Sequence, residues 1–411
     1  MQNMLLYINW DGFGQYYFRQ MPDREQTLPT LTGLMKEGVF FENAYTGIPS
    51  ITYPMQCAIV SGCYSDGTGN CDKFWDREKN EIVLQRRFNR AKTIGEQLRE
   101  KGIPFVSVQQ FALQDKGAEY GEKNSLYVQP NGNFDRRFEV LNELLLSRRI
   151  RSGRRVFEYE KMPDVIFAYM DDLDAVGHNP PSVGARTEQK RIEMVQAQLC
   201  EMDRALGRTL DLLKKSGQYE HTYFLLTSDH GMLPFWGASK LPQLKKALRD
   251  AGCGRVVSQT AGPISKKNFD VLLTAHDIQC QVYFTKERDD QERIKAELLK
   301  LPFVEQVLTK EELRTRGVCE EYADMLVSPT EGNYFGTEGV PLLGLHASHD
   351  SLHEKCQKVF AFACGPGLKR GYNYKQSVST IEFLPLLCRC MRLPVMEHVP
   401  LRKELIQSVM K

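Results

Sequence analysis

Five short apolar runs recur along the chain, and longer amphipathic stretches separate them. The runs are LLYIN (5–9), PFVSV (104–108), VIFAYM (165–170), YFLLTS (223–228) and KVFAFA (358–363). Short continuous apolar runs are typical of strands that are buried on both faces. Helical periodicity between them, over 91–101 and 187–216, indicates helices that cover those faces. The sequence therefore predicts an α/β fold with a mostly parallel central sheet and helices on both faces.

The segment from about 235 to 345 has a different character from the rest of the chain. It combines a polar insertion (KLPQLKKALRDAG), strand-like QVYFT and DMLVS, and a charged helical stretch (DDQERIKAELLK). No internal repeat or low-complexity linker indicates independently folding modules. We predict a single catalytic domain over 1–411, with a smaller substrate-side lobe inserted at about 235–345.

Basic and acidic residues nearly cancel, with 54 Lys and Arg against 52 Asp and Glu. No global field therefore attracts a nucleic-acid polymer or an anionic membrane. The N-terminal MQNMLLYINWDGFGQ predicts a first strand rather than a signal peptide, and no apolar stretch reaches the roughly eighteen residues of a membrane span. The eleven cysteines mostly lie in apolar segments, as is typical of reduced core thiols. We predict a cytoplasmic protein without membrane contact; the sequence leaves its oligomeric state open.

Acidic residues directly follow three of the apolar runs. LLYIN leads into Asp11, VIFAYM into Asp171, Asp172 and Asp174, and YFLLTS into Asp229. Because ligands of open parallel sheets bind beyond the carboxyl ends of the strands, these side chains are expected at one edge of the sheet. Carboxylates gathered there repel one another unless cations neutralise them.

Histidines accompany these carboxylates in the segments DAVGH (His178), SDHG (His230) and GLHASHD (His346 and His349). Mixed Asp and His ligands favour zinc or a similar divalent metal, whereas an oxygen-only set favours magnesium or calcium. The ligands suffice for two ions, which at about 4 Å separation clamp the attacking and leaving oxygens of an in-line displacement. We predict two divalent metal ions, Zn²⁺ in the first place and Mn²⁺ as the alternative.

Thr52 is the candidate nucleophile. It stands in GIPSITYPMQCAIVSG, just before Pro54 and an expected helix over 55–60. A hydroxyl at a helix N-terminus gains from the positive end of the dipole, and the neighbouring amides can hold a phosphate. Bound to a metal, the hydroxyl can ionise near neutral pH. Threonine is also a good helix cap, and the two roles are compatible.

Together these pieces resemble the alkaline phosphatase superfamily, and within it the nucleotide pyrophosphatase/phosphodiesterase branch. The resemblance runs nearly end to end. The matching pieces are Asp11-Gly12, the TxP segment from Thr52 to Gly62, DxxGH (174–178), SDHGM (228–232), and GxH followed by FAxGPGxKRG (344–371). Each piece is weak by itself, but their order and spacing are specific.

The resemblance implies two metal groups. One zinc would be held by Asp174, His178 and His346, and the other by Asp11, Asp229 and His230 with Thr52. His349 would then be a surface or supporting residue. The resemblance also implies hydrolysis of phosphodiester or pyrophosphate bonds in nucleotide-like small molecules through a covalent phospho-threonine intermediate.

The resemblance further implies substrate contacts. Aromatic residues at Tyr53 and Tyr169 would sandwich a nucleobase. An Asn amide after the nucleophile helix holds a phosphoryl oxygen in this branch, and Asn70 is the nearest candidate, although GTGNCDKFWD departs from the usual spacing. Lys73 is the alternative, and a lysine there would suit a phosphomonoester or phosphonate.

Other functions stay open. Phosphonoacetate hydrolase-like or phosphomonoesterase activity would use the same threonine and metals, and a non-catalytic homologue would bind a ligand without turnover. A sulfatase is excluded, because TYPMQ lacks both the Cys or Ser nucleophile and the Arg of a CxPxR-like segment. A metal-dependent phosphoglycerate mutase would need a serine nucleophile followed by a large inserted domain, whereas this chain has Thr52 and no such insertion after it.

Overall fold

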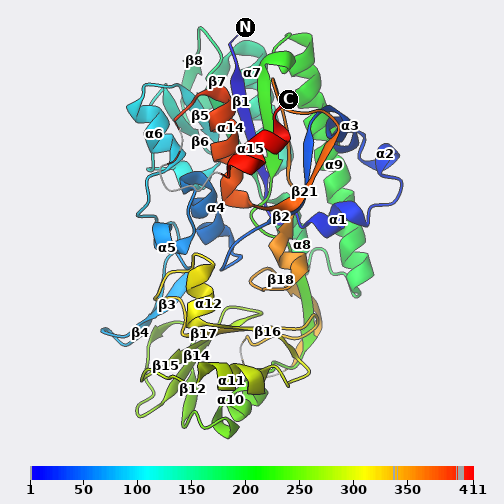
Figure 1. Ribbon diagram of the computed structural model, residues 1–411. Helices are drawn as coiled ribbons and strands as arrows, with labels where there is room; N and C mark the ends of the chain where they lie inside the picture. The colour runs from blue at the N-terminus through cyan, green and yellow to red at the C-terminus, as the bar shows by residue number, and fades with distance from the viewer. Residues whose placement is uncertain (1, 337, 340, 395, 397–401) are drawn as a thin grey trace.

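A nine-stranded sheet crosses the larger part of the molecule (Figure 1). The computed structural model describes residues 2–336, 338–339, 341–394, 396 and 402–411. The strand order is β19 (Lys358–Val359), β2 (Val39–Tyr45), β20 (Phe362–Cys364), β10 (Thr222–Thr227), β1 (Met4–Trp10), β9 (Val165–Met170), β5 (Phe105–Val108) and β6 (Ser125–Val128), and β21 (Tyr372–Ser379) also pairs with β2. β1 lies in the middle, between β9 and β10.

The strands from β10 to β6 in this order are parallel to their neighbours, which confirms the predicted fold class. The last apolar run, 358–363, differs from the expected single strand: it divides into β19 and β20, and β20 is antiparallel to both β2 and β10. Only the four-residue α13 (Glu354–Gln357) precedes it. α13 lies beside the carboxyl end of β10, where the Gly231 amide donates to the Cys356 carbonyl oxygen, so the chain enters β20 from that end and runs antiparallel to β10.

Helices cover both faces of the sheet, because successive residues of each central strand point to opposite sides. Leu6 and Ile8 of β1 belong to one core, and Leu5 and Tyr7 belong to the other. The first core is covered by α1 (Gln15–Arg19), α3 (Pro29–Glu37), α7 (Phe134–Ser147) and α9 (Glu188–Lys215). The second is covered by α4 (Thr52–Ser61), α6 (Ile94–Glu100), α14 (Phe383–Met391) and α15 (Lys403–Val409).

A second sheet lies inside the span 235–345, in the lower part of Figure 1. Its order is β12 (Val256–Ser258), β14 (Val271–Ala275), β15 (Cys280–Phe284), β17 (Met325–Pro329) and β16 (Val304–Thr309). Helices α10 (Leu241–Asp250), α11 (Gln291–Leu298) and α12 (Lys310–Thr315) accompany it. Leu244, Val282 and Ile294 belong to a core separate from those of the large sheet. We refer to this part, 241–329, as the lobe.

Two connections join the lobe to the large sheet. The antiparallel ribbon of β11 (Leu233–Gly237) and β18 (Leu342–Ser348) carries the chain out and back. The hairpin of β3 (Lys73–Asp76) and β4 (Glu81–Leu84) pairs with β13 (Gly262–Pro263), and Trp75 packs against Tyr283.

The remaining elements are short. They are α2 (Arg24–Thr27), α5 (Ser65–Thr68), α8 (Asp172–Gly177), the hairpin of β7 (Arg149–Ser152) and β8 (Arg155–Glu158), and the 3₁₀ turns η1 (Phe111–Leu113), η2 (Tyr219–His221) and η3 (Thr380–Glu382). Among the described residues, no helix combines the length and the apolar character needed to cross a membrane.

Candidate active site

The three central strands deliver carboxylates to one edge of the sheet, as the sequence predicts. Asp11 follows β1, Asp229 lies two residues after the end of β10, and Asp174 lies in α8 directly after β9. Because β1 pairs in parallel with both β9 and β10, the three strands end side by side. The parallel pairing of these strands thus brings the three carboxylates to the same edge of the sheet.

Asp11, Asp229 and His230 form the first group, with ligand atoms all within 4.8 Å of one another and side chains almost completely buried. The Nδ1 atom of His230 lies 3.0 Å from the carbonyl oxygen of Gly231, which can only accept a hydrogen bond. Nδ1 therefore donates, and in the neutral ring Nε2 carries a bare lone pair. That atom lies 3.2 Å from Asp11 Oδ1 and 3.0 Å from Thr52 Oγ1.

Asp174, His178 and His349 form a second group beside the first. His178 Nε2 lies 3.3 Å from one carboxylate oxygen of Asp174, and His349 Nε2 lies 3.9 Å from the other. The Nδ1 atoms of these two rings each donate to a backbone carbonyl at 2.9 Å, that of Ala347 and that of Ser50. The ring centroids of His349 and His230 stack at 3.8 Å, so the two groups are in direct contact.

The structure brings His349, and not His346, to this second group. His346 lies within β18, where its ring is 5.9 Å from that of Phe235 on the neighbouring strand. β18 ends at Ser348, so His349 leaves the strand end just as Asp11 leaves β1. Of the two expected roles for His349, a surface or a supporting residue, burial contradicts the surface one, because His349 is 7% exposed. The GxH motif indicates His346, whereas the structure places His349 beside Asp174, because the end of this partly exposed strand is not visible in the sequence.

The donor atoms fit divalent cations. Burial and the carboxylates of Asp229 and Asp174 raise the pKa of Asp11 well above its usual range. Burial favours neutral His178, yet the Asp174 carboxylate raises the pKa of that imidazole to about 9. Asp11 Oδ1 and Asp174 Oδ1 are buried without a hydrogen-bond donor. The Nε2 atoms of His230 and His349 face these two oxygens and leave a place for positive charge. Metal-binding histidines commonly donate their other nitrogen to a carbonyl in this way.

Thr52 is the first residue of α4, which begins earlier than the expected 55–60, and Ile51 is its N-cap. The Thr52 hydroxyl makes no capping hydrogen bond; it faces His230 instead. Pro54 fits the first helical turn, where a missing amide hydrogen costs nothing. The sequence therefore predicts the position of Thr52 well, while its alternative role as a cap is not found.

A layer of hydrogen bonds holds the carboxylates. Gln56 Nε2, one turn along α4, donates to Asp229 Oδ2 at 2.9 Å. Gln56 Oε1 in turn accepts from Gln110 Nε2 at 2.8 Å. The Tyr169 hydroxyl donates to Asp11 Oδ2. These contacts fix the side chains on which metal geometry depends.

A cavity of about 650 Å³ opens at Thr52. It is lined by Asp11, Thr52, Tyr53, Arg86, Arg87, Gln109, Phe111, Gln114, Tyr127, Gln129, Tyr169, Asp171 and Asp174. Tyr53 is 36% exposed, but Tyr169 is only 4% exposed. The ring of Phe111 packs edge-on between them, 5.2 Å from Tyr53 and 5.1 Å from Tyr169. Phe111, which the sequence did not indicate, thus lies against both rings of the expected Tyr53 and Tyr169 sandwich.

Asn70 and Lys73 do not line this cavity. The Asn70 amide donates to the carbonyl oxygens of Arg86 and Phe88 at 2.8 and 2.7 Å. Lys73 Nζ donates to the carbonyl oxygen of Ala275 in the lobe at 2.9 Å. Asn70 instead ties down the loop that carries Arg86 and Arg87 into the cavity wall. Those two arginines lie in an irregular loop without motif or periodicity, so no sequence signal pointed to them.

Known proteins resemble this chain at low identity. It is 24% identical to human ectonucleotide pyrophosphatase/phosphodiesterase family member 1 over 94% of this chain, but it spans only 40% of the length of that relative. It is 21% identical to bis(5′-adenosyl)-triphosphatase from Xenopus laevis, over 93% of this chain and 76% of the relative. A solved structure of murine ectonucleotide pyrophosphatase/phosphodiesterase 5, an inactive variant in complex with AMP, superposes with a TM-score of 0.67 at 17% identity, with both chains covered fully. At that identity the likeness establishes the fold.

The family assignment comes from a separate comparison. The model of the family described as type I phosphodiesterase / nucleotide pyrophosphatase matches residues 5–339. This span begins in β1 and contains Asp11, Thr52, Asp174 and Asp229. The chain belongs to the type I phosphodiesterase / nucleotide pyrophosphatase family.

Proposed function

We propose that this protein hydrolyses phosphodiester or pyrophosphate bonds in nucleotide-like small molecules. The observation that carries the proposal is the position of the Thr52 hydroxyl, 3.0 Å from His230 Nε2 and at the end of a cavity with aromatic walls. Family membership supports it. So do the name of the Xenopus relative, a bis(5′-adenosyl)-triphosphatase, and the AMP in the murine structure.

We assign seven residues as ligands of two zinc ions. Asp174, His178 and His349 would hold one; Asp11, Thr52, Asp229 and His230 would hold the other. When bound, such ions neutralise charge that develops on the phosphate oxygens and lower the pKa of a neighbouring hydroxyl. The nitrogen and oxygen donors suit Zn²⁺, and Mn²⁺ is the alternative.

The chain's own groups then act in two steps. The Thr52 oxygen forms a bond to phosphorus while the bond to the leaving oxygen breaks, which gives a phospho-threonine. Water then attacks phosphorus from the opposite side and releases Thr52. The amides of Thr52 and Tyr53 precede the first hydrogen bond of α4, from Met55 to Ile51, so they can donate to the phosphate at the positive end of the helix dipole.

Tyr53 and Phe111 are the aromatic groups that we assign to the nucleobase. Tyr53 is partly exposed at the cavity and Phe111 packs against it. We assign the Tyr169 hydroxyl to holding the Asp11 carboxylate. Arg86 and Arg87 lie on the same wall and compensate negative charge on a nucleotide. The cytoplasmic location stays a prediction from the sequence.

The test is hydrolysis of the p-nitrophenyl ester of thymidine 5′-phosphate beside p-nitrophenyl phosphate, with zinc-loaded and chelator-treated protein. We expect zinc-dependent turnover that favours the diester. A preference for the monoester would contradict the diester proposal and indicate a phosphomonoesterase. No turnover of either ester by protein with two bound zinc ions would indicate a homologue that binds without catalysis.

A further inference from the structure

A second cavity, of about 710 Å³, adjoins the one at Thr52. Gln129 lines both cavities. Ser152, in the wall of the second, donates a hydrogen bond at 3.3 Å to the carbonyl oxygen of Tyr127, which lines the first. The two cavities therefore share the Gln129 side chain in their walls. A substrate that fills the first cavity has a place for a further group in the second.

The second cavity has a strongly basic wall. Residues 148–155 read RRIRSGRR, and Gly153, with a φ of +58°, makes the turn between β7 and β8. Arg149 is engaged in an ion pair with Glu158 at 2.9 Å. Arg154 and Arg155 are exposed at the tip and line the cavity, and within the described part of the chain neither has a carboxylate at ion-pairing distance. Two guanidinium groups without a counter-charge favour an anionic occupant.

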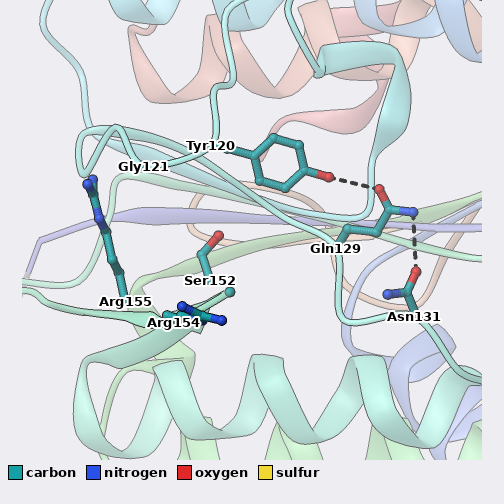
Figure 2. Close-up of a pocket in the computed structure, with 8 residues that line it drawn as sticks. Tyr120, Gly121, Gln129, Asn131, Ser152, Arg154 and Arg155 are labelled. Carbon is teal, nitrogen blue, oxygen red and sulfur yellow. Dashed lines mark hydrogen bonds between the residues drawn. The ribbon is translucent and has the colours of Figure 1, made fainter.

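The opposite wall is polar and fixed. The Tyr120 hydroxyl donates to Gln129 Oε1 at 2.9 Å, and Gln129 Nε2 donates to Asn131 Oδ1 at 3.3 Å (Figure 2). The Tyr120 ring rests edge-on against Tyr127 at 5.0 Å. Figure 2 shows Arg154 and Arg155 across the cavity from Gln129 and Asn131. Uncharged walls add no competing carboxylate to the site.

Outside the proposed metal groups, the carboxylate that lines the first cavity is also neutralised. Asp171 lies in the first cavity but is paired with Arg137 at 2.6 Å. Arg87 donates to the neutral Gln114 side chain at 2.6 Å, and among the described residues it makes no ion pair with a carboxylate. The electrostatic field therefore favours an anion on the side of the nucleoside away from the metal groups.

We propose that the second cavity binds a further phosphate of the substrate, carried on the ribose side of the nucleoside and distant from the bond that is cleaved. The substrate class is thus a nucleotide ester with a second phosphate on its sugar, held by Arg154 and Arg155. This inference rests on the proposed function, because it uses the nucleoside site at Tyr53 and Phe111.

The experiment compares two substrates that differ only in that phosphate: the p-nitrophenyl ester of thymidine 5′-phosphate, and the same ester with a 3′-phosphate. We expect kcat/KM to be about tenfold higher for the 3′-phosphorylated ester, since two exposed arginines pair with it. In the double variant Arg154→Gln, Arg155→Gln the ratio should fall to about one, with kcat/KM for the plain ester unchanged.

The matched control is Arg149→Gln, Arg151→Gln, which removes the same charge from the same hairpin but from residues that do not line the cavity. It should keep the preference. Equal kcat/KM for both esters in the wild type, or a preference that survives the loss of Arg154 and Arg155, overturns the inference and leaves the proposed function standing. The inference is also overturned if the double variant Arg86→Gln, Arg87→Gln loses the preference while the variant Arg154→Gln, Arg155→Gln keeps it. No zinc-dependent turnover of either ester overturns both.

Discussion

The imidazole of His349 is held on three sides. Its Nδ1 donates to the Ser50 carbonyl oxygen, its face stacks on His230, and its Nε2 is directed toward Asp174. The Ser50 hydroxyl also donates to the carbonyl oxygen of His349 at 2.6 Å, which fixes the backbone. Such a ring has little freedom left and one nitrogen to offer, as is typical of a metal ligand.

His349→Ala and His346→Ala form a matched pair. We expect His349→Ala to bind one zinc per chain instead of two and to lose turnover by about 100-fold or more, because a ligand is missing. His346→Ala should keep both ions and most of the turnover. Zinc content after gel filtration and kcat on the thymidine ester measure both effects. The reverse pattern would show that the GxH motif, and not the geometry, identifies the ligand.

Thr52 is a candidate for both metal binding and bond formation, and substitution separates these roles. Thr52→Ala should retain zinc, since Asp11, Asp229 and His230 remain, but lose turnover by roughly 10⁴-fold because no oxygen is left to attack. Thr52→Ser restores a hydroxyl and should recover part of the rate. Asp229→Ala should lose the zinc of its group as well as turnover. Substantial activity in Thr52→Ala would contradict the covalent mechanism.

The turn after β1 sets the spacing between the two metal groups. Gly12 has a φ of +73°, and a Cβ added there would lie 2.8 Å from the Cα of Asp174. The absence of a side chain thus lets α8 approach the end of β1. Asp11, the preceding residue, depends on the same close contact.

Gly12→Ala should therefore lower zinc affinity by about tenfold or more and destabilise the fold by about 1–3 kcal/mol. Gly102→Ala is the control: Gly102 also has a positive φ, of +66°, but a Cβ there meets nothing within 4 Å. It should cost stability without changing zinc affinity. Urea unfolding and zinc titration separate the two effects. Equal loss of zinc affinity in both variants would show that backbone strain, rather than the contact with Asp174, matters.

The predictable part of the site is the part that follows from strand ends. Asp11 and Asp229 come after apolar runs whose ends are clear in the sequence, and the parallel topology brings them together. His349 follows β18, an exposed ribbon strand without an apolar pattern, so its end could not be seen. Phe111 and the arginine pair 86–87 lie in loops, whose positions depend on packing rather than on periodicity. Asn70 and Lys73 lie in a segment that departs from the spacing usual in the family, and both side chains are used for contacts with backbone carbonyls.

Metal removal should affect the stability of the whole molecule. Asp11, Asp174 and Asp229 are gathered in a buried site, and burial with mutual repulsion raises the pKa of Asp11. Cations that bind only the folded state add about 2.7 kcal/mol at a hundredfold excess over Kd. We expect a chelator to lower the Tm by about 5 °C, measured by calorimetry.

Asp11→Asn serves as the control for this effect. It removes one of the repelling charges, so its Tm should exceed that of the chelator-treated wild type and should respond less to the chelator. An unchanged wild-type Tm after verified zinc removal would show that the carboxylates are accommodated without cations.

The place at which the lobe interrupts the chain determines when the metal site can form. His230 and His349, whose rings stack, lie on opposite sides of the segment 231–348, which holds the ribbon and the lobe. The two rings can meet only after that segment has closed on itself, and closing such a long loop is slow. We therefore expect metal capture to be a late event in folding. Zinc uptake followed by a fluorescent indicator during refolding should lag behind the recovery of helical circular dichroism.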